Sequence, residues 1–110
     1  MIVCVSTYRR ELSQDDDTLL AEHFAFMDTQ YEGGRLIASG PRIPRTGGVI
    51  IVRGDDLASA RLLLAHEPLA REGIATYLLF PFRATRASGP DLLDADTQPQ
   101  RPTEVDRCVS

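Results

Sequence analysis

Residues 49–52 read Val49-Ile50-Ile51-Val52, four β-branched side chains in a row, and give the strongest β-strand signal in the chain. Just upstream, residues 35–39 form a second short, mostly apolar segment. The loop between the two segments contains the pair Gly47-Gly48, which is typical of a turn. The middle of the chain therefore predicts two consecutive strands.

On either side of these two strands the sequence predicts one helix and one strand. Before them, residues 2–7 are β-branched or small, and residues 18–32 place apolar side chains at three- and four-residue spacing after an acidic cluster. After them, a helix is predicted to begin behind Asp55 or Asp56 and to end at Pro68, followed by a strand over residues 74–82. The predicted order is βαββαβ.

This order predicts an α+β, ferredoxin-like fold, because each pair of strands joined by a helix has a strand of the other pair between its members. The four-stranded sheet is then antiparallel, in the order fourth, first, third, second strand, with both helices on one face. The first, third and fourth strands are continuous apolar runs, which indicates burial on both faces. We therefore predict a homodimer in which the bare sheet faces of two copies pack together.

Composition excludes several classes of function. The chain has 110 residues and a net charge of −4, which suits one domain and argues against binding to nucleic acid. No apolar run approaches a membrane span, and no charged leader precedes the first strand, so we expect a cytoplasmic protein without a membrane partner. Residues 1–83 are expected to form the domain, and the Pro-containing residues 84–110 a flexible or partner-docking C-terminal tail, with Leu92-Leu93 as the docking point.

No phosphate loop, dinucleotide motif or pair of CxxC motifs is present, and the chain has only two histidines, so neither a cofactor nor a metal is expected. His66 is expected to be solvated. Cys4, within an apolar strand, is expected to be a small core residue.

His23 is the informative residue, because it falls on the apolar face of the first helix. The topology brings the end of the second helix, and with it Glu67, to the same end of the sheet. Such a carboxylate fixes the tautomer of the imidazole and leaves the other ring nitrogen free to move a proton. The alternative is a structural histidine that Glu67 simply satisfies. The same end is predicted to collect the substrate-binding residues Arg9, Ser39, Arg42 and Arg45.

Several short motifs, in order and spacing, resemble the YCII-related family over residues 1–83. They are His23-Phe24-Ala25-Phe26-Met27, Gly34-Arg35-Leu36, Ser39-Gly40-Pro41, Gly48-Val49-Ile50-Ile51-Val52, Glu67-Pro68-Leu69 and Pro81-Phe82-Arg83. The resemblance implies the dimeric α/β barrel group and an active site at His23 and Glu67. The family's usual acid at the second position is Asp, so Glu67 departs from it by one methylene.

The resemblance implies chemistry on small cyclic or quinoid compounds. Three functions follow as hypotheses. The first is a cofactor-independent lyase or isomerase in which His23 moves a proton and Glu67 orients it. The second is a small-ligand binding or accessory protein of a metabolic pathway, and the third is a cofactor-free oxygenase.

Overall fold

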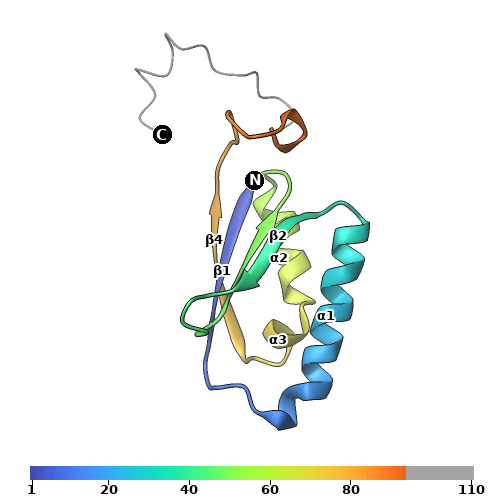
Figure 1. Ribbon diagram of the computed structural model, residues 1–110, viewed down its shortest axis with the longest axis vertical. Helices are drawn as coiled ribbons and strands as arrows, with labels where there is room; N and C mark the ends of the chain where they lie inside the picture. The colour runs from blue at the N-terminus through green and yellow to red at the C-terminus, as the bar shows by residue number, and fades with distance from the viewer. Residues whose placement is uncertain (94–110) are drawn as a thin grey trace.

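The computed structural model describes residues 1–93, and it has the predicted α+β architecture (Figure 1). The strands are β1 (Ile2–Tyr8), β2 (Leu36–Pro41), β3 (Gly48–Val52) and β4 (Ala75–Pro81); the helices are α1 (Asp17–Glu32), α2 (Leu57–Ala65) and α3 (Pro68–Arg71), with the 3-10 turns η1 (Gln14–Asp16) and η2 (Pro90–Leu92). Among these residues no helix is long and apolar enough to cross a membrane.

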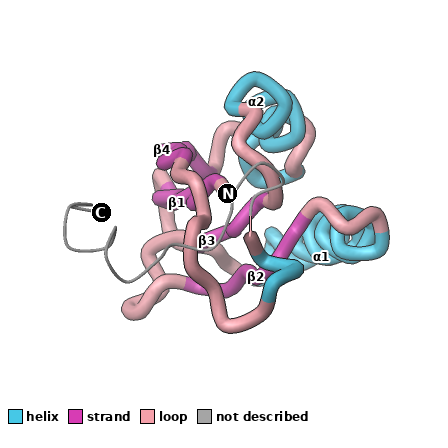
Figure 2. Tube along the Cα trace, turned by 90° about the horizontal axis from the view of Figure 1, so that it is seen from above, coloured by secondary structure: helices cyan, strands magenta, loops and turns pink. Residues whose placement is uncertain are grey.

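The four strands form one antiparallel sheet in the order β2-β3-β1-β4, which confirms the predicted topology. In the register, Cys4 of the central strand β1 lies opposite Ile50 on one side and Leu79 on the other. Seen from above, α1 and α2 lie on the same side of the sheet (Figure 2). Within residues 1–93, no α-helix lies against the other side of the sheet.

The start of α1 is set by local polar contacts. Ser13 and Asp16 form a capping box in the turn η1 that precedes α1: the Ser13 side chain accepts from backbone amides of that turn, and the Asp16 carboxylate accepts from the Ser13 amide at 2.8 Å. Arg10 donates two hydrogen bonds to the Asp16 carboxylate, at 2.8 and 2.9 Å. These bonds, led by the one from the Arg10 side chain, hold the pKa of Asp16 well below its ordinary value. The acidic cluster therefore lies at the helix start as predicted. Ser13 caps the preceding turn η1, whereas Asp16, the N-cap residue of α1, makes no side-chain cap bond to that helix.

The second helical segment differs from the prediction. Asp56 caps α2 by accepting a hydrogen bond from the Ser59 amide at 3.1 Å, but α2 ends at Ala65 and not at Pro68. Pro68 is instead the first residue of the short helix α3. Proline suits that position because the first turn of a helix has no partner for the missing amide.

The core lies between the helices and one face of the sheet. Ile2, Cys4 and Ile50 from the sheet pack with Met27 of α1 and Leu64 of α2, all of them buried. From Ile2 to Ser6 of β1, buried and half-buried residues alternate. The core is therefore one-sided, as expected for an antiparallel sheet with helices on one face.

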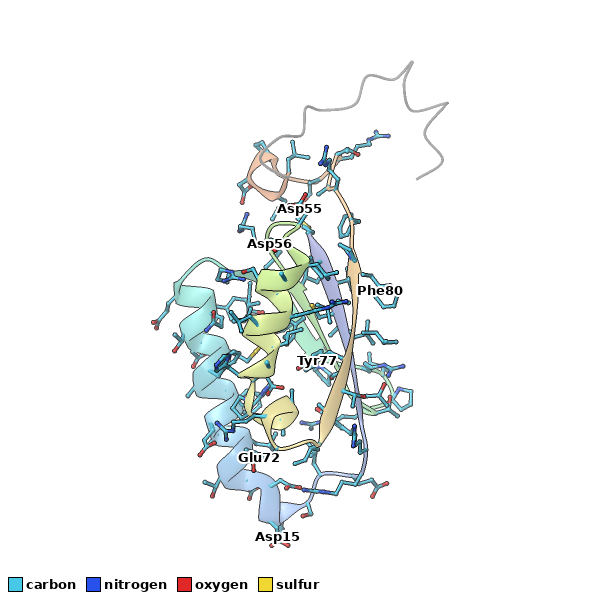
Figure 3. All side chains as sticks on the ribbon, turned by 180° about the vertical axis from the view of Figure 1, so that it is seen from behind. Asp15, Asp55, Asp56, Glu72, Tyr77 and Phe80 are labelled. Carbon is cyan, nitrogen blue, oxygen red and sulfur yellow. The ribbon has the colours of Figure 1, made fainter. Side chains whose placement is uncertain are left out.

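The opposite face of the sheet is exposed in the single chain, so the expectation of burial on both faces is not met within one copy. Leu78 and Phe80 of β4 are 67% and 52% exposed. Phe80 points away from the helices, whereas Tyr77 points toward them (Figure 3). The physical reason is the strand period of two: an apolar run places every second side chain on the bare face.

The segment after β4 is described as far as Leu93. Ala84 is buried, and Arg53 donates a hydrogen bond to the Asp91 carbonyl oxygen at 2.8 Å, within the turn η2. Residues 94–110 of the predicted tail, including Cys108, lie outside the described residues.

Candidate active site

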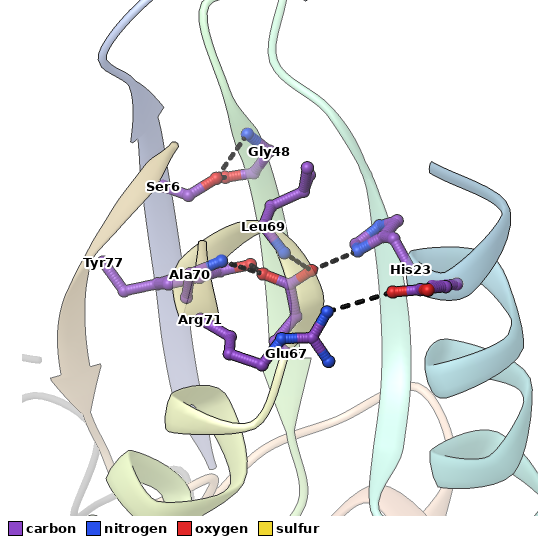
Figure 4. A network of polar contacts seen from close by, with 9 residues as sticks. Ser6, His23, Gly48, Glu67, Leu69, Ala70, Arg71 and Tyr77 are labelled. Atoms are coloured by element: carbon purple, nitrogen blue, oxygen red, sulfur yellow. Dashed lines mark hydrogen bonds and ion pairs between the residues drawn. The ribbon is translucent and has the colours of Figure 1, made fainter. Parts of the chain in front are cut away.

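His23 lies on α1, on the side of the helix that faces the sheet. Its side chain is 17% exposed, and its ring meets the edge of Phe24 with the two ring centroids 5.3 Å apart. The Nδ1 atom lies 2.5 Å from Oε1 of Glu67 (Figure 4). Nε2 has no hydrogen-bond partner among residues 1–93. The ring is thus anchored through Nδ1, while Nε2 is unpaired among these residues.

Glu67 precedes α3 and is completely buried. It is the N-cap of that helix: Oε1 accepts from the Leu69 amide at 2.9 Å, and Oε2 accepts from the Ala70 amide at 3.1 Å. Oε2 also accepts a hydrogen bond from the hydroxyl of Tyr77, at 3.1 Å. With His23, the carboxylate therefore has four partners, as a buried charge requires.

These contacts determine the ionisation of the carboxylate. Burial raises the pKa of Glu67, but hydrogen bonds from His23 and from the Leu69 and Ala70 amides outweigh burial, so that its pKa lies below the ordinary value. An ionised carboxylate only accepts hydrogen bonds, so it requires a proton on Nδ1 of His23. The neutral ring then has its lone pair on Nε2.

A cavity of about 290 Å³ lies between α1 and the sheet, and His23 forms part of its wall. Its lining is mainly apolar, with side chains such as Leu20, Met27 and Ile50. The volume is at the lower end of the range for small-molecule sites. The cavity can therefore accept a compact, largely apolar ring next to the imidazole.

Of the predicted substrate-binding residues, Arg45 and Ser39 line this cavity. The Arg45 side chain makes no hydrogen bond or ion pair with the described residues, whereas Ser39 meets the hydroxyl of Tyr31 at 2.6 Å. The Arg45 loop is held against β1 by a close approach: a Cβ on Gly47 would come within 1.8 Å of the Ser6 carbonyl oxygen. Glycine is needed there for space.

The other two predicted residues lie elsewhere. Arg42 is not part of the cavity lining and donates to Thr7 Oγ1 at 3.1 Å. Arg9 lines a separate, open cleft between the start of α1 and the end of α3. The structure thus brings His23, Arg45 and Ser39 to one cavity. Glu67 contacts His23 but does not line the cavity, and Arg9 and Arg42 also lie outside its lining.

Tyr77 was not singled out in the sequence. It lies inside the apolar run of β4. The only sequence signal is its place in the alternation of the strand, which puts it on the same face as Ala75 and Leu79. Burial and then the Glu67 charge raise the pKa of the Tyr77 hydroxyl far above its ordinary value, so it remains a donor. Among residues 1–93, no group of three or more His, Cys, Asp or Glu side chains is placed to hold a metal ion.

Comparison with known proteins gives a family and a fold. The sequence model described as "YCII-related domain" matches residues 1–83. No curated protein matches the sequence. A solved structure of 5-chloro-2-hydroxyhydroquinone dehydrochlorinase (TftG) from Burkholderia phenoliruptrix AC1100, in complex with 2,5-dihydroxybenzoquinone, is similar with a TM-score of 0.59 and 15% identity, over 76% of this chain and 94% of that one. At this identity the likeness concerns the fold.

Proposed function

The chain belongs to the YCII-related domain family, and we propose that it catalyses proton transfer on a small cyclic or quinoid compound, as a lyase or isomerase without a cofactor. The observation that carries this proposal is the position of His23, whose Nδ1 lies 2.5 Å from the buried Glu67 carboxylate while the ring forms part of the cavity wall. A base held in one tautomer at the edge of an apolar cavity is suited to general acid-base catalysis.

In the proposed mechanism, Nε2 of His23 accepts a proton from a hydroxyl or C–H group of the bound compound. In an isomerisation the same proton returns to another atom of the ring. In an elimination, the electron pair left by the proton forms a double bond, and a leaving group such as chloride departs with the electrons of its own bond. Glu67 stabilises the protonated imidazole and touches no substrate atom.

Arg45 is proposed to bind an anionic oxygen of the substrate. It is the cation in the cavity lining, and its side chain has no partner among residues 1–93. Ser39, held by Tyr31, offers a second polar contact in the same lining. Roles in binding for Arg9 and Arg42 stay predictions, since neither lines the cavity.

The first compound to test follows from the fold neighbour, a 5-chloro-2-hydroxyhydroquinone dehydrochlorinase in complex with 2,5-dihydroxybenzoquinone. We would follow chloride release and ultraviolet absorbance with 5-chloro-2-hydroxyhydroquinone and with related halogenated hydroquinones. Wild-type protein and His66→Gln, a control on the exposed second histidine, should turn over at the same rate. His23→Gln should lose at least about 100-fold in kcat, the usual contribution of a general base. Equal rates for His23→Gln and wild type on a compound that is turned over would refute the proposal.

A binding or accessory protein is the second candidate, and one observation favours it. Glu67 already caps α3 and holds Tyr77, so the fold alone accounts for its burial. This candidate predicts that 2,5-dihydroxybenzoquinone binds in calorimetry, that His23→Gln changes its affinity, and that no tested compound is converted. An oxygen electrode in the same assays tests the third hypothesis, a cofactor-free oxygenase, which requires oxygen uptake.

We also propose that two copies pair through the bare sheet face. The register puts Val3 and Val5 of β1 beside Phe80 and Leu78 of β4 on this face, and both β4 side chains are more than half exposed in one chain. An apolar patch of this kind on a small domain marks an interface. A closed twofold pair would cover the patch on both copies at once.

A further inference from the structure

Tyr77 connects the candidate active site to the sheet. It lies on β4 directly opposite Ser6 of β1, and its hydroxyl donates to Oε2 of Glu67 at 3.1 Å (Figure 4). The other partners of this carboxylate are the Leu69 and Ala70 amides of α3 and the His23 ring of α1. Among the described residues, Tyr77 is therefore the contact that ties the carboxylate to the sheet.

The four hydrogen bonds to the Glu67 carboxylate are divided equally between its two oxygens. Oε1 is shared by His23 and the Leu69 amide, and Oε2 is shared by the Ala70 amide and Tyr77. A Glu side chain ends in a broad, soft torsion about its last bond, so the plane of its carboxylate is set by its partners. With Tyr77 and Ala70 on one oxygen, the other is aimed at Nδ1 of His23.

The neighbouring atoms fix Tyr77 in turn. Its ring packs in the core between the sheet and the helices, beside both clusters of buried residues. Ser6 across the strand pair is buried and accepts a hydrogen bond from the Gly48 amide at 2.8 Å. The hydroxyl of Tyr77 is thus presented to Glu67 from a rigid strand and not from a loop.

We infer that Tyr77 is a positioning residue, which holds the Glu67 carboxylate and, through it, the orientation of the His23 ring at the cavity. It does not react itself, because its hydroxyl proton is engaged by Glu67. The effect on turnover rests on the proposed function, whereas the effect on the His23 ring does not. Measuring turnover and the state of the His23 ring in the same variants separates the two effects.

The test compares Tyr77→Phe with Tyr31→Phe by proton NMR. Both variants remove one hydroxyl from the same cavity lining, but the Tyr31 hydroxyl contacts Ser39 and not Glu67. The readout is solvent exchange of the His23 Nδ1 proton, assigned with His66→Gln. We expect about tenfold faster exchange in Tyr77→Phe, which corresponds to about 1.4 kcal/mol, and no change in Tyr31→Phe. With a compound that is turned over, kcat should fall about tenfold at unchanged KM.

The measurements distinguish a failure of the inference on Tyr77 from a failure of the proposed function. If Glu67→Gln alters the His23 proton while Tyr77→Phe behaves like Tyr31→Phe, the inference on Tyr77 is overturned and the proposed function is untouched. If Tyr77→Phe alters the proton but no compound is ever converted, the inference stands and the proposed function fails. Phe keeps the ring packing of Tyr77, so a loss of the folded state in Tyr77→Phe, seen by circular dichroism, would show a structural role and also overturn the inference.

Discussion

Replacing Glu67 with Gln should destabilise the protein far more than its small change in shape suggests. Gln has the same length, and its amide oxygen can take the place of Oε1, where it accepts from His23 and the Leu69 amide. Its NH₂ group then lies against the Ala70 amide and the Tyr77 hydroxyl, which are both donors to Oε2 in the native protein. The hydroxyl can rotate and accept, but the backbone amide cannot.

The size of the effect follows from that unmatched donor. A buried amide left without an acceptor costs about 1 to 3 kcal/mol. The lost charge at the start of α3 adds a few tenths of a kcal/mol. We therefore expect the free energy of unfolding to fall by about 2 kcal/mol, which for a domain of this size lowers Tm by about 10 °C.

The assay is urea unfolding followed by circular dichroism, with Glu72→Gln as the matched control. Glu72 is about half exposed and pairs only with Arg71 among the described residues, so its loss should change stability by less than about 0.5 kcal/mol. Equal midpoints for Glu67→Gln and Glu72→Gln would show that the carboxylate contacts described here contribute nothing to stability.

Three further predictions concern acid, thiol reactivity and assembly. The pKa of folded Glu67 lies below its ordinary value of 4.5, so its stabilisation is complete above that pH and is lost as the pH falls through the folded pKa. Wild type should therefore lose its advantage over Glu67→Gln in urea midpoints measured below about pH 4.5, and a constant gap would contradict this reasoning. Burial raises the pKa of Cys4 to about 11, so in a Cys108→Ser background a thiol reagent at neutral pH should label the protein only in denaturant; rapid labelling of the folded protein is the opposing result. Leu78→Asp places a charge on the bare sheet face, so light scattering should give a dimer for wild type and a monomer for the variant; a monomeric wild type would refute the pairing.

The sheet was predictable because its signals are local. Residues 49–52 and 2–7 are rich in β-branched side chains, and the helices between the strands have clear starts. Given four strands and two helices in this order, the handedness of the crossovers leaves few arrangements, and the confirmed order β2-β3-β1-β4 is the result. The end of α2 was placed wrongly because Pro68 suits both the stop of one helix and the first turn of another.

The meeting of His23 and Glu67 followed from topology, which places both at one end of the sheet. The finer parts of the site depend on strand register and rotamers, which no residue pattern encodes. In the sequence, Tyr77 is one more residue of an apolar strand. Its position opposite Ser6 follows only from the register of β1 and β4. Nothing in the sequence distinguishes Arg42 from Arg45, because both lie in the same loop. Only the path of that loop at Gly47 places Arg45 at the cavity and Arg42 against Thr7.

In the proposed site, Glu67 holds His23 with its proton on Nδ1 and leaves Nε2 as the base at the cavity. Long-range ¹H–¹⁵N NMR on ¹⁵N-histidine protein, assigned with His66→Gln, distinguishes the two neutral tautomers directly. We predict that neutral His23 is protonated on Nδ1 in the wild type and that this preference is lost in Glu67→Ala, which removes the acceptor for that proton. A proton on Nε2 in the wild type, or the same tautomer mixture in both proteins, would show that Glu67 does not set the tautomer of His23.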